Sequence, residues 1–160
     1  MTQQVPAIDR VELTDLNARF ARALDTHEYA QLRGILAPDV HYVSGGGEFH
    51  DAEAVIANFQ ARAPGRTSRH GLGNFVVEPG PDGTVIGHST WHNFATHDPD
   101  PTGVPIYMVA DFTDRYRRTP DGWRIAERII TPVFRNAEHA PREGAGSVSG
   151  SGAGSGEVER

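Results

Sequence analysis

The sequence predicts an α+β domain in which a curved antiparallel sheet wraps around a long first helix. Two observations support this. Over roughly the first 60 residues, apolar side chains recur at the spacing of amphipathic helices. The chain then changes to long segments of alternating character, joined by turns rich in Pro, Asp and Gly. Three helices followed by four long strands therefore indicate one domain, which we place at residues 5–138.

The first helix is predicted to begin at Asp9, with Glu12 completing a capping box. One face of this helix is apolar: Leu13, Leu16, Phe20, Ala23 and Leu24. A second, short helix is expected over Tyr29–Leu36 and ends before Pro38. The third helix follows Asp51, whose side chain can cap its N-terminus.

The strands are predicted from β-prone segments between turn sequences. A short strand at His41–Val43 can pair with Glu48–His50 across a glycine turn. Four long strands follow, at Arg69–Glu78, Thr84–His97, Val104–Arg117 and Trp123–Phe134. The linking sequences PGPDG, HDPDPTG and TPDG favour hairpins, so we expect these four strands to be antiparallel neighbours.

Composition excludes several chemistries. The 15 basic residues are all Arg and there is no Cys, so neither a catalytic lysine nor a thiolate nucleophile is available. The net charge of −6 argues against nucleic-acid or membrane partners. The polar start shows no signal peptide, so we expect a cytoplasmic protein. Residues 139–160 include GAGSVSGSGAGSG and are predicted to form a flexible tail.

Three local sequences suggest a family. Asp25 ends the helical segment in FARALDTHEYAQLRGILAPDVHYV, His70 opens the strand RHGLGNFVVE, and DFTDRYRRTPDGWRIAERII forms the last hairpin. With the order of elements, they resemble the nuclear-transport-factor-2-like superfamily and its SnoaL-like branch. This branch includes ketosteroid isomerases, polyketide cyclases, scytalone-type dehydratases and hexachlorocyclohexane dehydrochlorinase, to which the pattern is most similar. The resemblance implies a cone-shaped fold and a homodimer formed through the outer sheet face.

Asp25 and His70 are the first candidate catalytic residues. A carboxylate that holds one imidazole nitrogen leaves the other nitrogen free to take a proton from a substrate. Histidine suits this role because its ordinary pKa, about 6.5, lies near neutral pH. The resemblance maps both residues onto the family's dyad. The alternative is that Asp25 only caps the next helix and His70 is an ordinary polar strand residue.

Arg128 and Tyr42 are the other candidates. Strict alternation would place Arg128 on the face opposite Trp123, where it could hold a leaving group or an enolate oxygen. Otherwise it is a surface arginine paired with Glu127 or Asp111. Tyr42 could donate a proton or a hydrogen bond to a substrate oxygen, or simply pack on its strand.

Six further side chains are predicted to bind substrate, or alternatively only to fill the core: Phe20, Trp91, Asn93, Met108, Ala110 and Phe112. The dehydrochlorinase-like pattern has a lysine at the position of Phe20, so the resemblance argues against chloride elimination here. Asn93 differs from the others because a buried amide needs hydrogen-bond partners, which a ligand could supply.

We expect no metal and no cofactor. His88 and His92 lie on one strand face, but four strand residues span roughly 13 Å. His41, His50 and His97 have no ligand-like spacing either. The favoured function is a dehydratase, isomerase or cyclase that acts without a cofactor on a hydrophobic polyketide, terpenoid or steroid-like metabolite. The alternatives are a non-catalytic ligand-binding or dimerisation domain and an enzyme of the epoxide-hydrolase type.

Overall fold

The computed structural model describes residues 4–142, so all but the first four residues of the tail predicted at 139–160 lie outside the described residues. Its helices are α1 (Ala7–Asp25), α2 (Ala52–Gln60) and the 3₁₀ segments η1 (Tyr29–Gly34), η2 (Pro81–Gly83) and η3 (Ala137–His139). Its strands are β1 (Leu36–Ser44), β2 (Gly47–Phe49), β3 (Thr67–Pro79), β4 (Val85–Thr96), β5 (Ile106–Thr119) and β6 (Gly122–Arg135).

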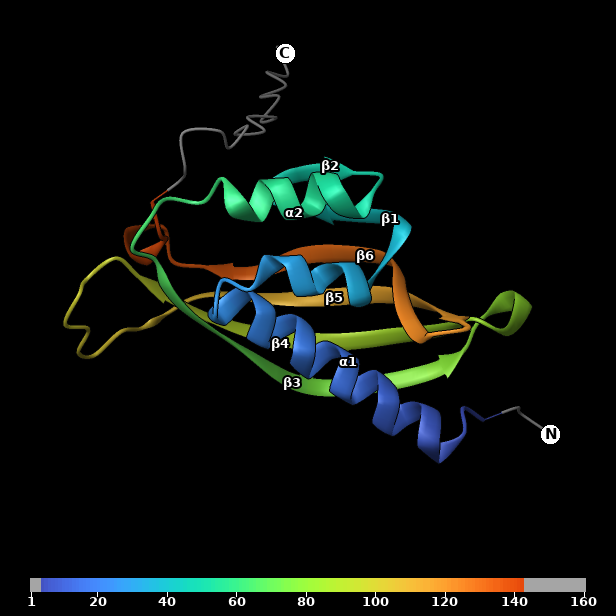
Figure 1. Ribbon diagram of the computed structural model, residues 1–160. Helices are drawn as coiled ribbons and strands as arrows, with labels where there is room; N and C mark the ends of the chain where they lie inside the picture. The colour runs from blue at the N-terminus through green and yellow to red at the C-terminus, as the bar shows by residue number, and fades with distance from the viewer. Residues whose placement is uncertain (1–3, 143–160) are drawn as a thin grey trace, which may run out of the picture.

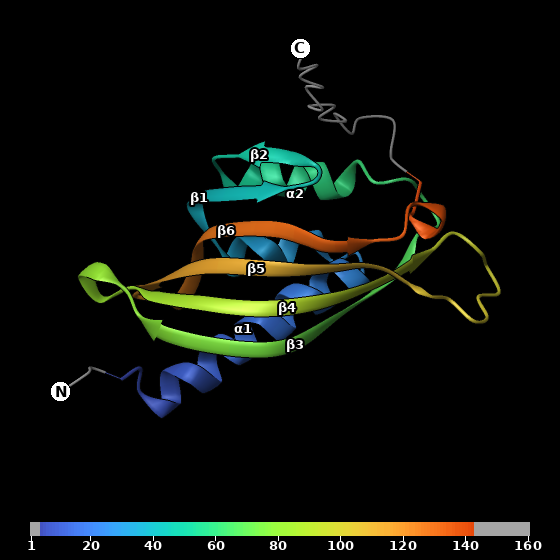
Figure 2. The same ribbon diagram turned by 180° about the vertical axis from the view of Figure 1, so that it is seen from behind.

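The strands form one six-stranded sheet in the order β2-β1-β6-β5-β4-β3. Helix α1 lies across one face of this sheet and α2 lies beside β1 and β2 (Figure 1), while the view from behind shows the opposite face without a helix over it (Figure 2). The predicted α+β class is confirmed. The sheet is mixed, however, because β1 runs parallel to β6. Local patterns locate a strand but cannot identify a neighbour that lies so far along the chain.

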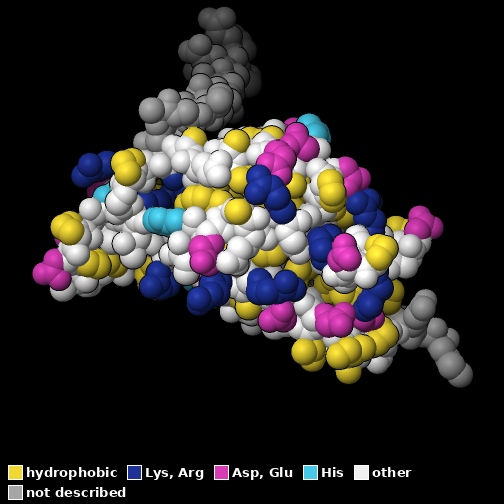
Figure 3. All heavy atoms as spheres, in the orientation of Figure 1, with side chains coloured by type: hydrophobic (Ala, Val, Ile, Leu, Met, Phe, Trp, Pro, Cys, Tyr) yellow, Lys and Arg dark blue, Asp and Glu magenta, His cyan; other side chains and the backbone are white. Residues whose placement is uncertain are grey.

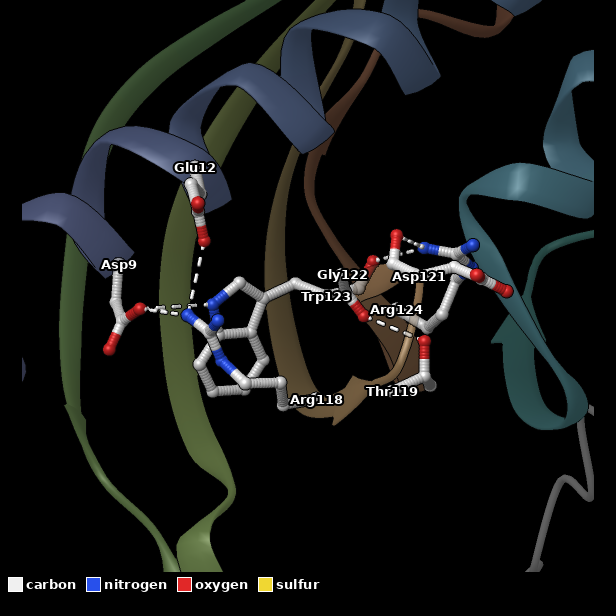
Figure 4. Close-up of polar contacts among 8 residues, drawn as sticks. All are labelled: Asp9, Glu12, Arg118, Thr119, Asp121, Gly122, Trp123 and Arg124. Atoms are coloured by element: carbon white, nitrogen blue, oxygen red, sulfur yellow. Dashed lines mark hydrogen bonds and ion pairs between the residues drawn. The ribbon is translucent and has the colours of Figure 1, made fainter.

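Helix α1 contributes one apolar face to the hydrophobic core. Its predicted apolar face is confirmed: Leu13, Leu16, Phe20, Ala23 and Leu24 are all buried. The predicted start is wrong, because the helix begins at Ala7 with Pro6 as its N-cap. Asp9 instead accepts hydrogen bonds from Arg118 and from Trp123 Nε1, at the tip of the β5–β6 hairpin (Figure 4). This contact fastens the first turn of the helix to the sheet.

The elements between α1 and β3 differ from prediction mainly at their ends. Segment η1 ends at Gly34, and β1 begins at Leu36, before Pro38 rather than after it. The β1–β6 register shifts between Leu36 and His41, around this proline, which cannot donate a ladder hydrogen bond. The predicted cap of α2 is confirmed, since Asp51 accepts a hydrogen bond of 2.7 Å from the amide of Ala54.

A bulge in β6 corrects the predicted alternation. The β5–β6 register shifts between Arg115 and Tyr116, opposite Ala126, which is therefore an extra residue in the ladder. Ile125 is buried before this point and Arg128 after it. The two side chains therefore share the inner side of the sheet, whereas strict alternation predicted opposite faces.

None of the described helices has the length and apolar character needed to cross a membrane. On the face seen in Figure 3, arginine and acidic side chains are interspersed rather than gathered by sign.

Candidate functional site

Asp25 and His70 form a hydrogen-bonded pair where the end of α1 meets β3. Asp25 Oδ1 lies 2.6 Å from His70 Nδ1. Asp25 Oδ2 accepts a 3.0 Å hydrogen bond from the His70 backbone amide, and Ser68 Oγ donates to Oδ1 at 3.1 Å. The structure thus brings together the two residues predicted to form a dyad. Their contact also fixes the imidazole ring in one orientation.

The surroundings set the charge state of this pair. Burial, only partly opposed by Asp25, holds the pKa of His70 below its usual 6.5. Burial alone would raise the pKa of Asp25, but the hydrogen bonds from His70 and Ser68 and the charge of His70 keep it below its usual 3.8. At neutral pH the pair is therefore a carboxylate and a neutral imidazole. In that state Nδ1 carries the proton and donates a hydrogen bond to Asp25, while Nε2 has a free lone pair.

His70 lines a cavity of about 310 Å³ between α1, α2 and the concave side of the sheet. Five other predicted site residues line it as well: Phe20, Tyr42, Asn93, Met108 and Phe112. Trp91 and Ala110 are fully buried but are not part of the cavity wall. A larger hollow of about 620 Å³ lies between the β4–β5 loop and residues 138–142, and contains none of the predicted catalytic residues.

Arg128 lies behind the cavity wall, not in it. Its guanidinium is fully buried and makes two 2.7 Å hydrogen bonds to Asp114 and one of 2.5 Å to Asn17. The ring of Phe20 covers it at 4.3 Å and that of Phe112 at 5.0 Å. It is thus neither a surface arginine nor a partner of Glu127 or Asp111. Tyr116, which donates to Asp114 at 2.6 Å, completes this buried network.

Tyr42 and Asn93 present polar groups to the cavity. Among the described residues, neither side chain has a hydrogen-bond partner, and Asn93 Oδ1 is fully buried. Asn93 is the β4 residue paired with His70 in the sheet register. Burial raises the pKa of Tyr42 to about 12, so its hydroxyl stays protonated at neutral pH. Both side chains therefore have hydrogen-bonding capacity that the described residues do not use.

The sequence analysis missed the basic part of the wall. Arg62 and Arg66 follow α2 and line the cavity, and Tyr107 of β5 accepts a 3.1 Å hydrogen bond from Arg66 Nη2. A sequence signal was available: from Ala54 to Val77 the chain has three arginines and no acidic residue. In a protein with more acidic than basic residues, such a stretch indicates arginines that have no acidic neighbour along the chain with which to form an ion pair.

A possible metal-ligand group lies elsewhere, on the β1–β2 hairpin. Ligand atoms of His41, Glu48 and His50 lie within 4.8 Å of one another. His41 Nδ1 also lies 3.0 Å from Glu127, as the second nitrogen of a metal-bound histidine often does. The fold creates this proximity, which sequence spacing did not predict. None of these side chains lines the cavity of the dyad.

The cavity on the concave side of the sheet is lined by His70, whose ring is held by Asp25, and such an arrangement fits a family of small-molecule-binding proteins. Residues 6–129 match the SnoaL-like domain, and the chain belongs to that family. Uncharacterised proteins of Mycobacterium tuberculosis and Mycobacterium bovis are each 29% identical to it over 136 residues, which cover 79% of this chain and 87% of theirs.

Solved structures agree on the fold. Aln2 from a Streptomyces species has a TM-score of 0.72 at 21% identity, covering 81% of this chain and 94% of its own. ActVI-ORFA from Streptomyces coelicolor has a TM-score of 0.70 at 17% identity, covering 78% of this chain and 96% of its own. A protein of unknown function with a cystatin-like fold from Nostoc punctiforme has a TM-score of 0.68 at 22% identity, covering 81% of this chain and 95% of its own.

Proposed function

We propose that the protein is an acid–base enzyme that works without a cofactor on a hydrophobic small molecule, as a dehydratase, isomerase or cyclase. The observation that carries this proposal is the 2.6 Å contact between Asp25 and His70, with His70 lining a cavity that also holds several aromatic side chains. A neutral imidazole fixed by a carboxylate is a general base already in its working tautomer.

In the proposed reaction, His70 Nε2 takes a proton from a carbon or hydroxyl of the substrate. Asp25 stabilises the imidazolium that forms, because its negative charge lies against Nδ1. Tyr42 donates a hydrogen bond to the oxygen on which charge develops. The imidazolium then returns the proton to a leaving hydroxyl or to another carbon, which completes an elimination or an isomerisation.

Arg128 has no direct part in this proposal, because Phe20 and Phe112 separate it from the cavity. We assign it a supporting role, in which it holds these two wall residues and the strand β6 in place. The epoxide-hydrolase alternative requires paired carboxylates around a water. No Asp or Glu is among the described residues that line the cavity, and Asp111 is exposed and bonded to Thr90.

A model carbon acid tests the base before the substrate is known. In 5-nitrobenzisoxazole a base removes the proton on C3 while the N–O bond breaks, which yields a coloured nitrophenolate. We expect the protein to accelerate this reaction, and His70→Ala to lose about 10²- to 10⁴-fold of kcat/KM. Asp25→Asn should lose activity through the wrong tautomer.

His50→Ala is the matched control, since His50 is exposed and outside the cavity, and it should retain full activity. Circular dichroism checks that each variant is folded. If folded His70→Ala reacts as fast as the unmodified protein, the proposed base is wrong. The remaining alternative would then be a ligand-binding or dimerisation domain without catalysis.

A further inference from the structure

The cavity has one strongly basic side. Arg62 and Arg66 line it, and Arg135 and Arg142 lie at its exposed rim. The described lining residues include no Asp or Glu, although the whole chain has 21 acidic residues and a net charge of −6. The lining of this cavity is therefore positively charged, although the net charge of the whole chain is negative.

Arg62 and Arg66 have no anionic partner in the part of the chain that the structure describes. The side chain of Arg62 makes no hydrogen bond or ion pair with the described residues, and its guanidinium lies 4.4 Å above the ring of Phe59. Arg66 Nε is buried without an acceptor, while its Nη2 donates to Tyr107. Burial, together with the charge of Arg66, lowers the pKa of Arg62. A partly buried cation without a counter-charge is unfavourable, so this region of the cavity favours an anion.

The same cations are close enough to the dyad to affect it. Burial is the main reason for the lowered pKa of His70, and the charges of Arg62 and Arg66 lower it further. An anionic group held at these arginines would thus lie in the same cavity as the base, leaving the rest of the ligand to reach Nε2. The rings of Phe20, Phe59 and Phe112 line the same cavity and suit an apolar ligand body.

We propose that Arg62 and Arg66 form a carboxylate-binding subsite, so that the ligand is a hydrophobic carboxylic acid anchored at the end of the cavity next to α2. Guanidinium groups match the planar carboxylate in shape and charge, and Arg66 Nε offers a donor that no group within residues 4–142 uses. That the anchored acid is also the substrate of His70 rests on the proposed function.

A matched pair of probes tests the subsite without a known substrate. By isothermal titration calorimetry, 2-naphthoate should bind about 10- to 100-fold more tightly than the neutral 2-naphthamide. Arg62→Gln and Arg66→Gln should each weaken naphthoate binding about tenfold or more, and the double variant should abolish the preference. Binding of the amide should stay unchanged.

Arg69→Gln is the matched control, because Arg69 belongs to the same acid-free stretch but does not line the cavity. It should bind both probes normally. Equal affinity for the two probes, binding of neither, or a preference that survives in the double variant would overturn the subsite. His70→Ala separates the two proposals: it should lose carbon-acid turnover but keep the preference for naphthoate. If catalysis is absent and the preference remains, only the proposed function fails.

Discussion

Replacing Arg128 by methionine tests whether this arginine belongs to the interior, as the structure has it, or faces a ligand. The guanidinium is fully buried and Asp114 is 1% exposed. Among the residues that the structure describes, removing the cation leaves the Asp114 carboxylate with one donor, the hydroxyl of Tyr116. Breaking one side of a buried ion pair costs about 3–5 kcal/mol, because the remaining charge is uncompensated.

For a domain of about 140 residues, the entropy of unfolding converts this loss into a decrease of roughly 10–17 °C in Tm. Urea unfolding followed by circular dichroism gives the free energy directly. The control is Arg117→Met, which removes an exposed pair with Asp39 and should cost less than about 1 kcal/mol. Adding Asp114→Leu to Arg128→Met should recover much of the stability, because no buried charge remains.

A loss below about 1 kcal/mol in Arg128→Met would refute this reasoning. It would mean that water or a ligand reaches the guanidinium, as expected of a cavity-facing arginine. The double variant could also keep its secondary structure without regaining stability. That result would show that packing around Phe20, rather than charge, determines the stability of this region.

Three other results should follow. Gly87→Ala should lower the free energy of unfolding by about 1–3 kcal/mol, because its Cβ would lie 2.6 Å from the ring of Tyr116. The control is Gly34→Ala, whose Cβ meets nothing within 4 Å and which should not destabilise the protein in the same urea assay. Asn93→Leu should stabilise the fold by about 1 kcal/mol, since the buried Oδ1 of Asn93 has no hydrogen-bond partner among the described residues. A destabilised variant would show that Oδ1 does have a partner. The pKa of His70 is below 6.5 in the folded state, so the unfolded chain binds the proton first as pH falls through 6.5, and stability decreases there. In His70→Asn the free energy of unfolding should vary less with pH between roughly 5 and 7; an equal slope would contradict the lowered pKa.

Much of the fold could be predicted because it depends on local pattern. The apolar face of α1, the cap at Asp51 and the long strands around Asp-Gly turns each follow from neighbouring residues. The parallel pairing of β1 with β6 and the bulge at Ala126 could not, since both depend on contacts between distant segments.

The candidate site was predictable to the extent that single residues match a family motif. Asp25 and His70 were named from the sequence and lie in contact. Arg128 was expected to face either the cavity or the surface, whereas it lies buried behind Phe20 and Phe112. The extra residue in β6, which puts Ile125 on the same side as Arg128, could not be predicted from alternation. Arg62 and Arg66 were missed although the acid-free stretch around them was visible in the sequence, because the sequence does not show that both arginines line the cavity.

The most direct test of the central claim is the protonation state of His70, measured by long-range ¹H–¹⁵N NMR over a pH titration. We expect a neutral ring at pH 7 with the proton on Nδ1, and a pKa below 6.5. In Asp25→Asn the preference for the Nδ1 tautomer should disappear. A ring protonated on Nε2, or an imidazolium at pH 7, would contradict the account, because no lone pair would then face the substrate.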